Sequence, residues 1–369
     1  MRSLRAALVI GLAAAFSDAV CRGVGLSGSA IAYGAVISVL IVRPDFSHWP
    51  LLLYPVLVVV VGFCMAIGVS IGLVLADVPE VLLFGMVAAL MQVLTLLLPA
   101  KLRLLSGVMA VTGVLPLLST APSWSDWRQQ LLALVIGLAI GSLLQQALRP
   151  HDTATPDPEP APEAEAAEPP AGARIRQGLR SPFFWRKLVF ASLALAIGQG
   201  VGAVTPKYVY FGVVLLLNDS IGATLARVRD RMVGVSLGIL MPLLVFNCLG
   251  IDTLSTGLVM GGTAALAVAL RAEDHLRTAL ISSGVAFVGY GPLVAWYIPH
   301  RWIDYLMGCL LALAVGVLVF PNSALRRFNR LREDPTSSPQ QLEALLGAAR
   351  EEARWLGLQE PRLPGAKPC

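Results

Sequence analysis

Four charged residues crowd together in one short stretch of an otherwise apolar chain. Arg227, Arg229, Asp230 and Arg231 lie between two apolar runs, although charged residues make up only 14% of the 369 residues. Guanidinium groups bind carboxylates through two parallel hydrogen bonds. Asp230 lies one helical turn after Arg227 and can pair with it. The stretch is therefore a candidate site for attracting a small organic anion.

The spacing around these arginines predicts a helix that begins near residue 220. In such a helix Arg227, Arg231, Gly234 and Gly238 form one stripe, because they follow the spacing i, i+4, i+7, i+11. Small residues allow a second helix backbone to approach closely in a membrane. The stripe then predicts that the basic end faces protein or the mouth of a cavity. The alternative is that the arginines only mark a cytoplasmic loop.

Other polar side chains lie inside or at the edge of apolar segments. Ionisable groups are costly there, so a role in binding or coupling is the default hypothesis. Either of two aspartates, Asp18 and Asp219, is a candidate carrier of a coupling proton. The candidate residues of this kind are Asp18, Gln199, Asn218, Asp219 and Asp304.

Each aspartate also has a simpler interpretation. Asp18 can lie at the outer end of the first span and meet water. Asp219 can lie at the cytoplasmic exit of a short span. Asp304 can form a surface pair with Arg301, three residues before it. The sequence leaves both interpretations open for all three.

Composition places these residues in a membrane protein. Hydrophobic residues make up 56% of the chain and the mean hydropathy is +0.73, whereas soluble domains are about 45–50% apolar. The excess falls in long runs, and roughly 20 apolar residues cross a bilayer as a helix. We expect an all-α polytopic membrane protein with about 12 transmembrane helices. The predicted spans are 4–21, 26–42, 50–75, 79–99, 102–119, 128–148, 186–204, 207–220, 231–249, 254–270, 276–298 and 301–320.

The distribution of basic residues predicts the orientation. Loops on one side hold 20 of the 28 lysines and arginines, loops on the other side hold 4, and the remainder lie in the distal tail. Cytoplasmic loops carry the excess of Lys and Arg, so both termini are expected in the cytoplasm. The same bias accounts for the net charge of +5 without nucleic acid as a partner.

Four segments are predicted. Residues 1–149 form a first six-helix repeat, and residues 183–321 form a second. Residues 150–182 are rich in Pro, Ala and Glu and are expected to be a disordered cytoplasmic linker. Residues 322–369 form a cytoplasmic tail with a basic start and one short helix, Pro339–Leu356.

The two predicted repeats align along their length. Matching Arg5 with Arg186 sets Asp18 opposite Gln199, and matching the prolines that close the halves sets Gly137 opposite Gly308. Six spans in each half predict parallel repeats, related by an axis along the membrane normal, as many transporters have. Gly308 is thus a candidate for helix packing, together with Gly234 and Gly238.

Motifs of enzymes are missing from the sequence. It contains no phosphate-binding Gly-rich loop, no GxSxG and no HExxH. The five cysteines are far apart and the four histidines are scattered, so neither a metal site nor a disulfide framework is indicated. We expect no catalytic residues and no cofactor.

The polar motifs of the second half resemble those of a known family. An apolar span ends near Asn218–Gly222, Arg231-x-x-Gly234-x-x-x-Gly238 opens the next span, and Arg301-x-x-Asp304-x-x-x-Gly308 opens a span that closes at Pro321. This pattern resembles the fusaric acid resistance and aromatic acid exporter family, over about residues 180–325 and loosely over residues 1–150. Val235 and Tyr305 replace threonines that are usual in the family. The first half lacks the basic motif, and the large cytoplasmic domain of typical members is missing.

The resemblance implies a secondary transporter that exports small, often aromatic, carboxylic acids across the inner membrane. Its implied partners are the organic anion, the lipid bilayer and a coupling proton, and a homo-oligomer is left open. Two alternatives remain. A major-facilitator-type transporter also has six plus six spans, but its usual loop motif between spans two and three is replaced here by RPDFSHWP. The other alternative is a non-transporting membrane scaffold or an anion channel.

Overall fold

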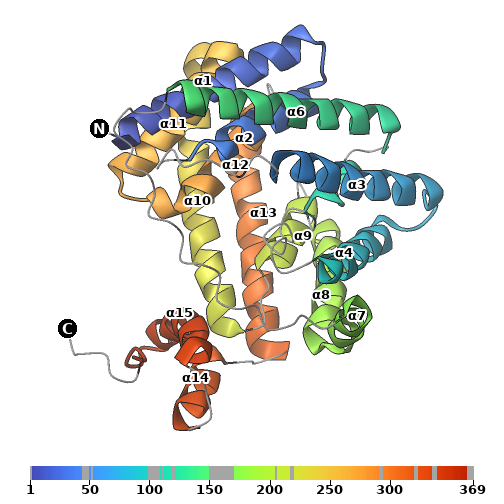
Figure 1. The fold of residues 1–369 in the computed structure, drawn as a ribbon, viewed down its shortest axis with the longest axis vertical. Helices are drawn as coiled ribbons and strands as arrows, with labels where there is room; N and C mark the ends of the chain where they lie inside the picture. The colour runs from blue at the N-terminus through green and yellow to red at the C-terminus, as the bar shows by residue number, and fades with distance from the viewer. Residues whose placement is uncertain are drawn as a thin grey trace. The chain divides into compact units, whose positions relative to one another are not determined.

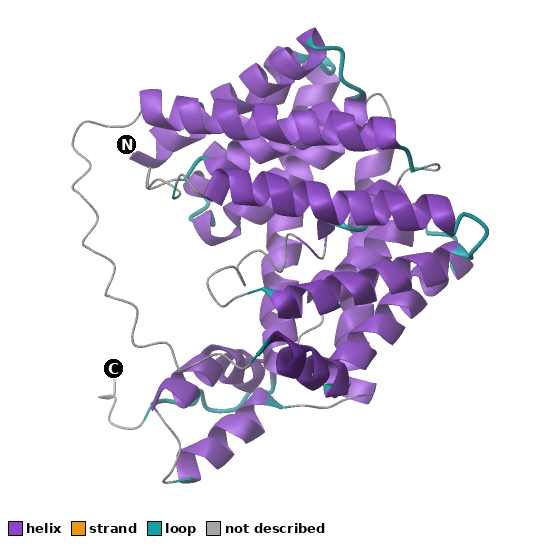
Figure 2. Ribbon diagram, turned by 45° about the vertical axis from the view of Figure 1, so that its right-hand side comes forward, coloured by secondary structure: helices purple, strands orange, loops and turns teal. Residues whose placement is uncertain are grey.

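The computed structural model describes residues 2–43, 50, 53–98, 109, 111–118, 122–148, 170–203, 206–216, 220–290, 294–319, 323–334 and 339–363. Every regular element in these residues is a helix (Figure 2). Five helices are long and apolar enough to cross a membrane, and four shorter apolar helices accompany them in the described ranges. The chain divides into two compact units, Met1–Phe184 with Val233–Trp302, and Trp185–Met232 with Ile303–Cys369.

The first unit is built mainly from helices of the first half of the chain and from two helices of the second. It also contains the C-terminal part of α10 (Ile221–Leu249) and the start of α13 (Val294–Ala314). Its other helices are α1 (Arg2–Gly23), α2 (Gly28–Ile41), α3 (Leu53–Val74), α4 (Glu80–Leu97), α6 (Trp124–Ala147), α7 (Ala171–Arg180), α11 (Thr253–Ala269) and α12 (Leu276–Tyr290).

Helices α1 and α11 run antiparallel and pack closely along their length (Figure 1). Three glycines make the close approach possible: a Cβ added at Gly11 would lie 2.9 Å from the carbonyl oxygen of Gly257 and 3.2 Å from the Cα of Gly261. Two helix backbones can meet in this way only where side chains are very small. The contact aligns the end of α1 with the beginning of α11.

Helices α2 and α6 run parallel, and two glutamines fix their register. The Oε1 of Gln129 accepts a hydrogen bond from the backbone N–H of Ser27 at 2.8 Å, and the Oε1 of Gln145 accepts one from Arg43 at 3.0 Å. The two bonds are sixteen residues apart on both helices (27 to 43 and 129 to 145). At 1.5 Å per residue this spacing is about 24 Å. The bonds satisfy N–H groups just outside both ends of the short helix α2.

Helix α12 packs against the glycines of α10. A Cβ added at Gly234 would lie 2.5 Å from the Cβ of Thr278, and one added at Gly238 would meet the carbonyl oxygen of Ala279. Both contacts advance along the two helices together, so α10 and α12 run parallel. The stripe of Gly234 and Gly238 predicted this close approach of a second helix backbone.

The second unit consists of α8 (Pro182–Gly200, from Trp185), α9 (Pro206–Leu216), the first part of α10, most of α13 with a π-helical extension (Val315–Val319), α14 (Ala324–Glu333) and α15 (Pro339–Trp355). Helices α14 and α15 form a hairpin around Phe328, which is fully buried. The carboxylate of Glu352, only 3% exposed, accepts hydrogen bonds from the N–H groups of Ala324 and Leu325. Glu352 thereby satisfies two donors that the start of α14 would otherwise leave unpaired.

The structure agrees with most predicted helix positions and corrects some. The predicted tail helix 339–356 is α15, and the predicted start near residue 220 is the start of α10. The predicted break at 299–300 is wrong, because α12 ends at Tyr290 and α13 runs from Val294 through Pro299 and His300. The predicted linker is helical over residues 171–180, where α7 forms. Residues 149–169 and most of the predicted span 102–119 lie outside the described residues.

Candidate functional site

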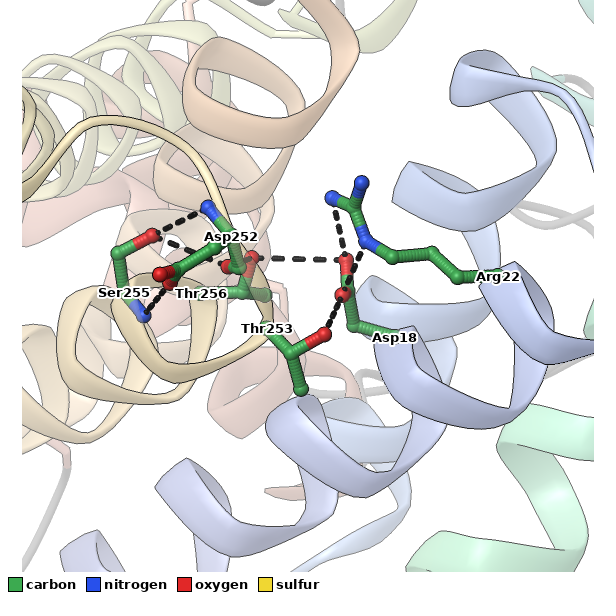
Figure 3. Close-up of polar contacts among 6 residues, drawn as sticks. All are labelled: Asp18, Arg22, Asp252, Thr253, Ser255 and Thr256. Carbon is green, nitrogen blue, oxygen red and sulfur yellow. Dashed lines mark hydrogen bonds and ion pairs between the residues drawn. The ribbon is translucent and has the colours of Figure 1, made fainter.

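A buried carboxylate joins the end of α1 to the first turn of α11 (Figure 3). The side chain of Asp18 is fully buried. Its Oδ2 accepts a hydrogen bond from the Nε of Arg22 at 2.6 Å, and its Oδ1 accepts one from the Nη2 at 3.2 Å. From α11, Thr253 donates its hydroxyl to Oδ2 at 2.7 Å. The Thr256 hydroxyl lies 3.5 Å from Oδ1 and has a closer acceptor in the carbonyl oxygen of Asp252, at 2.8 Å. Asp18 therefore does not meet water directly. This differs from the simpler interpretation of the sequence, which placed it in water at the outer end of the first span.

The start of α11 is held in place by its own capping residues. Asp252 accepts a hydrogen bond from the N–H of Ser255 at 2.6 Å, and the Ser255 hydroxyl accepts one from the N–H of Asp252 at 2.7 Å. These two bonds form a capping box. The hydrogen bonds from Ser255 lower the pKa of the Asp252 carboxyl. The rigid first turn presents Thr253 and Thr256 to Asp18, where the positive end of the α11 dipole also favours a negative charge.

The ion pair at Asp18 is asymmetric in its access to solvent. The Arg22 side chain is 40% exposed, whereas that of Asp18 is fully buried. An anion from outside the bundle can therefore reach the guanidinium without first reaching the carboxylate.

The basic start of α10 lies in the second unit and contacts the tail hairpin. Arg229 donates through Nη1 to both carboxylate oxygens of Glu351 in α15, at 2.9 and 3.1 Å. A Cβ added at Gly222 would meet the carbonyl oxygen of Ala348. Arg227 is exposed and Arg231 is half-buried. Arg229, which lies off the predicted stripe, therefore pairs with the tail.

The remaining predicted residues have different surroundings. Asp304 is only 3% exposed, so it lies in the interior rather than at the surface. Gln199 is exposed on α8. Asn218 and Asp219 lie outside the described residues. In the described part of the chain, no group of three or more His, Cys, Asp or Glu side chains is placed to hold a metal ion.

The predicted packing glycine Gly308 meets another glycine. A Cβ added at Gly308 would lie 3.0 Å from the carbonyl oxygen of Val209 and 3.1 Å from the Cα of Gly212, both on α9. In the first unit, a Cβ added at Gly137 of α6 would lie 2.5 Å from the carbonyl oxygen of Gly34 on α2. Each contact joins the second and the last predicted span of one half of the chain.

Sequence reasoning missed three partners of Asp18. Arg22 had a usable signal, since Asp and Arg four residues apart on a helix are neighbours. Thr253 and Thr256 had none, because they are more than 230 residues away in the chain. Their role depends on the antiparallel packing of α1 against α11.

Comparison with known families gives one match. Residues 193–315 match the family model described as fusaric acid resistance protein-like. Neither the search of curated proteins nor the search of solved structures gave a significant match. The resemblance predicted from the polar motifs of the second half is thereby confirmed over this segment. With the apolar helices, the match indicates a membrane protein with a transport- or efflux-related function.

Proposed function

We propose that this protein is a secondary transporter that exports small, often aromatic, carboxylic acids across the bacterial inner membrane. The family match over residues 193–315 carries the proposal. The matched segment includes the basic start of α10 and the buried Asp304, which are polar features that a purely structural membrane helix does not need.

The directions of neighbouring helices support 12 spans that cross the membrane in alternating directions. With both termini in the cytoplasm, as the distribution of basic residues predicts, odd-numbered spans leave the cytoplasm and even-numbered spans return to it. The first and tenth predicted spans, α1 and α11, run antiparallel, as this requires. The second and sixth, α2 and α6, run parallel, as do the ninth and eleventh, α10 and α12. Two parallel spans need an odd number of crossings between them, and the predicted spans 50–75, 79–99 and 102–119 supply three.

The glycine contacts support the proposed pair of parallel repeats. The sequence alignment sets Gly137 opposite Gly308. In the first half, Gly137 packs on Gly34 of the second span. In the second half, Gly308 packs on Gly212, which is again in the second span of its half. Equivalent helices thus use glycines for the same contact in both halves. A matched pair of contacts between helices far apart in sequence supports the proposed repeats.

In the proposed mechanism the two charged features act at opposite membrane surfaces. Arg227 and Arg231 attract the carboxylate at the cytoplasmic mouth. We assign the coupling proton to Asp18, whose carboxylate pairs with Arg22 near the outer end of α1. Entry of a proton on this residue would then accompany export of the acid.

The test of substrate class uses cells that lack the protein. Deleting it should sensitise the cells to hydroxybenzoates, and adding it back should restore growth and efflux of the labelled acid. Arg231→Ala should slow efflux at least tenfold, whereas Arg176→Ala, at an exposed position on α7, should leave it unchanged. Full export by well-expressed Arg231→Ala would refute the role of this arginine, and unaltered resistance of the deletion strain would refute the substrate class.

The test of coupling uses Asp18→Asn in proteoliposomes. This change keeps the shape of the side chain and an acceptor for Thr253, but it removes the titrating carboxyl. We expect efflux driven by a pH gradient to stop, while exchange of labelled for unlabelled acid at equal pH continues. Gradient-driven efflux by Asp18→Asn at the wild-type rate would refute proton coupling through this residue.

A further inference from the structure

Helix α14 turns its apolar side inward and a row of arginines outward. Phe328 is fully buried against α15, and Leu325 and Leu331 pack beside it. At 100° per residue, the side chains of Arg326, Arg327 and Arg330 lie within one 100° sector on the opposite face. All three are exposed. Glu333 is exposed beside Arg326, so the face holds three arginines and one carboxylate and carries a net positive charge.

We propose that this face, Arg326, Arg327 and Arg330, binds the headgroups of anionic phospholipids in the leaflet next to the tail. The last apolar helix is described to Val319 and α14 begins at Ala324. Five residues reach at most about 17 Å. The arginine face therefore starts within reach of the phosphate layer at the end of that span. Basic clusters directly beside a transmembrane helix bind anionic lipid in this way.

The packing of the hairpin decides how the lipid is held. A basic amphipathic helix that lies in the membrane interface inserts its apolar face between the acyl chains. Here α15 occupies that face, so α14 has only charge to offer to the bilayer. Guanidinium groups suit phosphate oxygens because they donate two parallel hydrogen bonds. We expect binding that depends on the charge of the headgroup and falls with ionic strength, with little dependence on acyl-chain length.

The experiment measures lipid binding by the full chain purified in a neutral detergent. Phosphatidylglycerol and phosphatidylcholine with the same acyl chains are titrated separately, and bound lipid is counted by native mass spectrometry. Each arginine beside an anionic surface changes partitioning by about fivefold, so three together contribute roughly 100-fold. The triple variant Arg326→Gln, Arg327→Gln, Arg330→Gln should lose one tight class of phosphatidylglycerol sites. The matched triple Arg→Lys variant keeps the charge and should retain most of the tight phosphatidylglycerol binding.

The outcomes separate the proposal from other sources of binding. Equal affinity for the two lipids in the wild type, or an unchanged phosphatidylglycerol class in the triple Gln variant, would overturn it. Inorganic phosphate at millimolar concentration should not displace the lipid, and full displacement would point to a phosphate site and overturn the lipid assignment. Unchanged thermal unfolding of the triple Gln variant in phosphatidylcholine confirms that the hairpin still folds. Transport is not measured, so the result is independent of the proposed export.

Discussion

Breaking the Asp18–Arg22 pair from its two sides should have unequal consequences. Arg22→Gln leaves a fully buried carboxylate whose close remaining donor is the hydroxyl of Thr253, with that of Thr256 at 3.5 Å. Asp18→Asn instead leaves a guanidinium that is 40% exposed and can be hydrated. The residue at position 18 still accepts the hydrogen bond from Thr253. The arginine change should therefore destabilise the protein more than the aspartate change.

The magnitudes follow from the burial of each partner. An uncompensated buried charge costs about 3–5 kcal/mol, and that range applies to Arg22→Gln because Asp18 has no access to water. For Asp18→Asn the lost ion pair is partly solvated already, and we expect about 1–2 kcal/mol, the value of a hydrogen bond to a charged group. At roughly 2 °C per kcal/mol for a large domain, the Tm should fall by about 6–10 °C and 2–4 °C respectively.

Thermal unfolding of the purified protein in one detergent measures both changes, and the double variant supplies the decisive comparison. Asp18→Asn removes the buried charge that makes Arg22→Gln costly. The double variant should therefore unfold at a higher temperature than Arg22→Gln alone, a coupling of about 2 kcal/mol or more. Additive losses, or an Arg22→Gln variant no less stable than Asp18→Asn, would refute the assignment of a buried ionised carboxylate.

Three further changes test the packing and capping contacts. Gly238→Ala should cost about 1–3 kcal/mol by thermal unfolding, because the new Cβ meets the backbone of α12, whereas Gly316→Ala, where the space is open, should not lower the Tm. Asp252→Ala should cost about 1 kcal/mol at pH 7. The pKa of Asp252 is lowered on folding, so its ionised form stabilises the protein above about pH 4. The difference in unfolding free energy between the wild type and Asp252→Ala should therefore shrink as the pH falls through the folded pKa. Glu352→Ala should speed tryptic cleavage in the tail roughly tenfold by uncapping α14, and the exposed Glu343→Ala should not.

The sequence predicted most helices because long apolar runs leave few alternatives. The starts of α10 and α15 were also predictable, from the arginine–glycine stripe and from the amphipathic tail. The boundary between α12 and α13 was placed wrongly, because His300 and Arg301 look like a loop between apolar segments. The better signal was Gly291–Pro292, since proline disfavours the helical conformation in the residue before it. A helix can carry a charged residue near its start, and α13 carries Arg301 as its eighth residue.

The tertiary partners of the polar residues could not be predicted. Asp18 was recognised as costly in an apolar span, and that cost is met by Arg22 on its own helix and by two threonines of α11. The spacing of four residues predicts Arg22 as a partner, but the threonines follow only from the register of α1 against α11. Arg229 shows the same limit. Its partner Glu351 lies 122 residues away in the tail, and nothing in the spacing of the basic stretch separates it from Arg227 or Arg231.

The two proposed repeats share their packing contacts but not their charges. Glycines join the second and last spans in both halves, through Gly34 with Gly137 and through Gly212 with Gly308. The position aligned with Asp18 is Gln199, which is exposed and uncharged, and the basic stretch of α10 has no counterpart in the first half. If duplication built the scaffold, then the substitutions that distinguish the halves mark where function was added. In the proposed mechanism the ion pair of α1 and the arginines of α10 both serve export, so loss of either should slow net export while the glycine contacts of both halves remain.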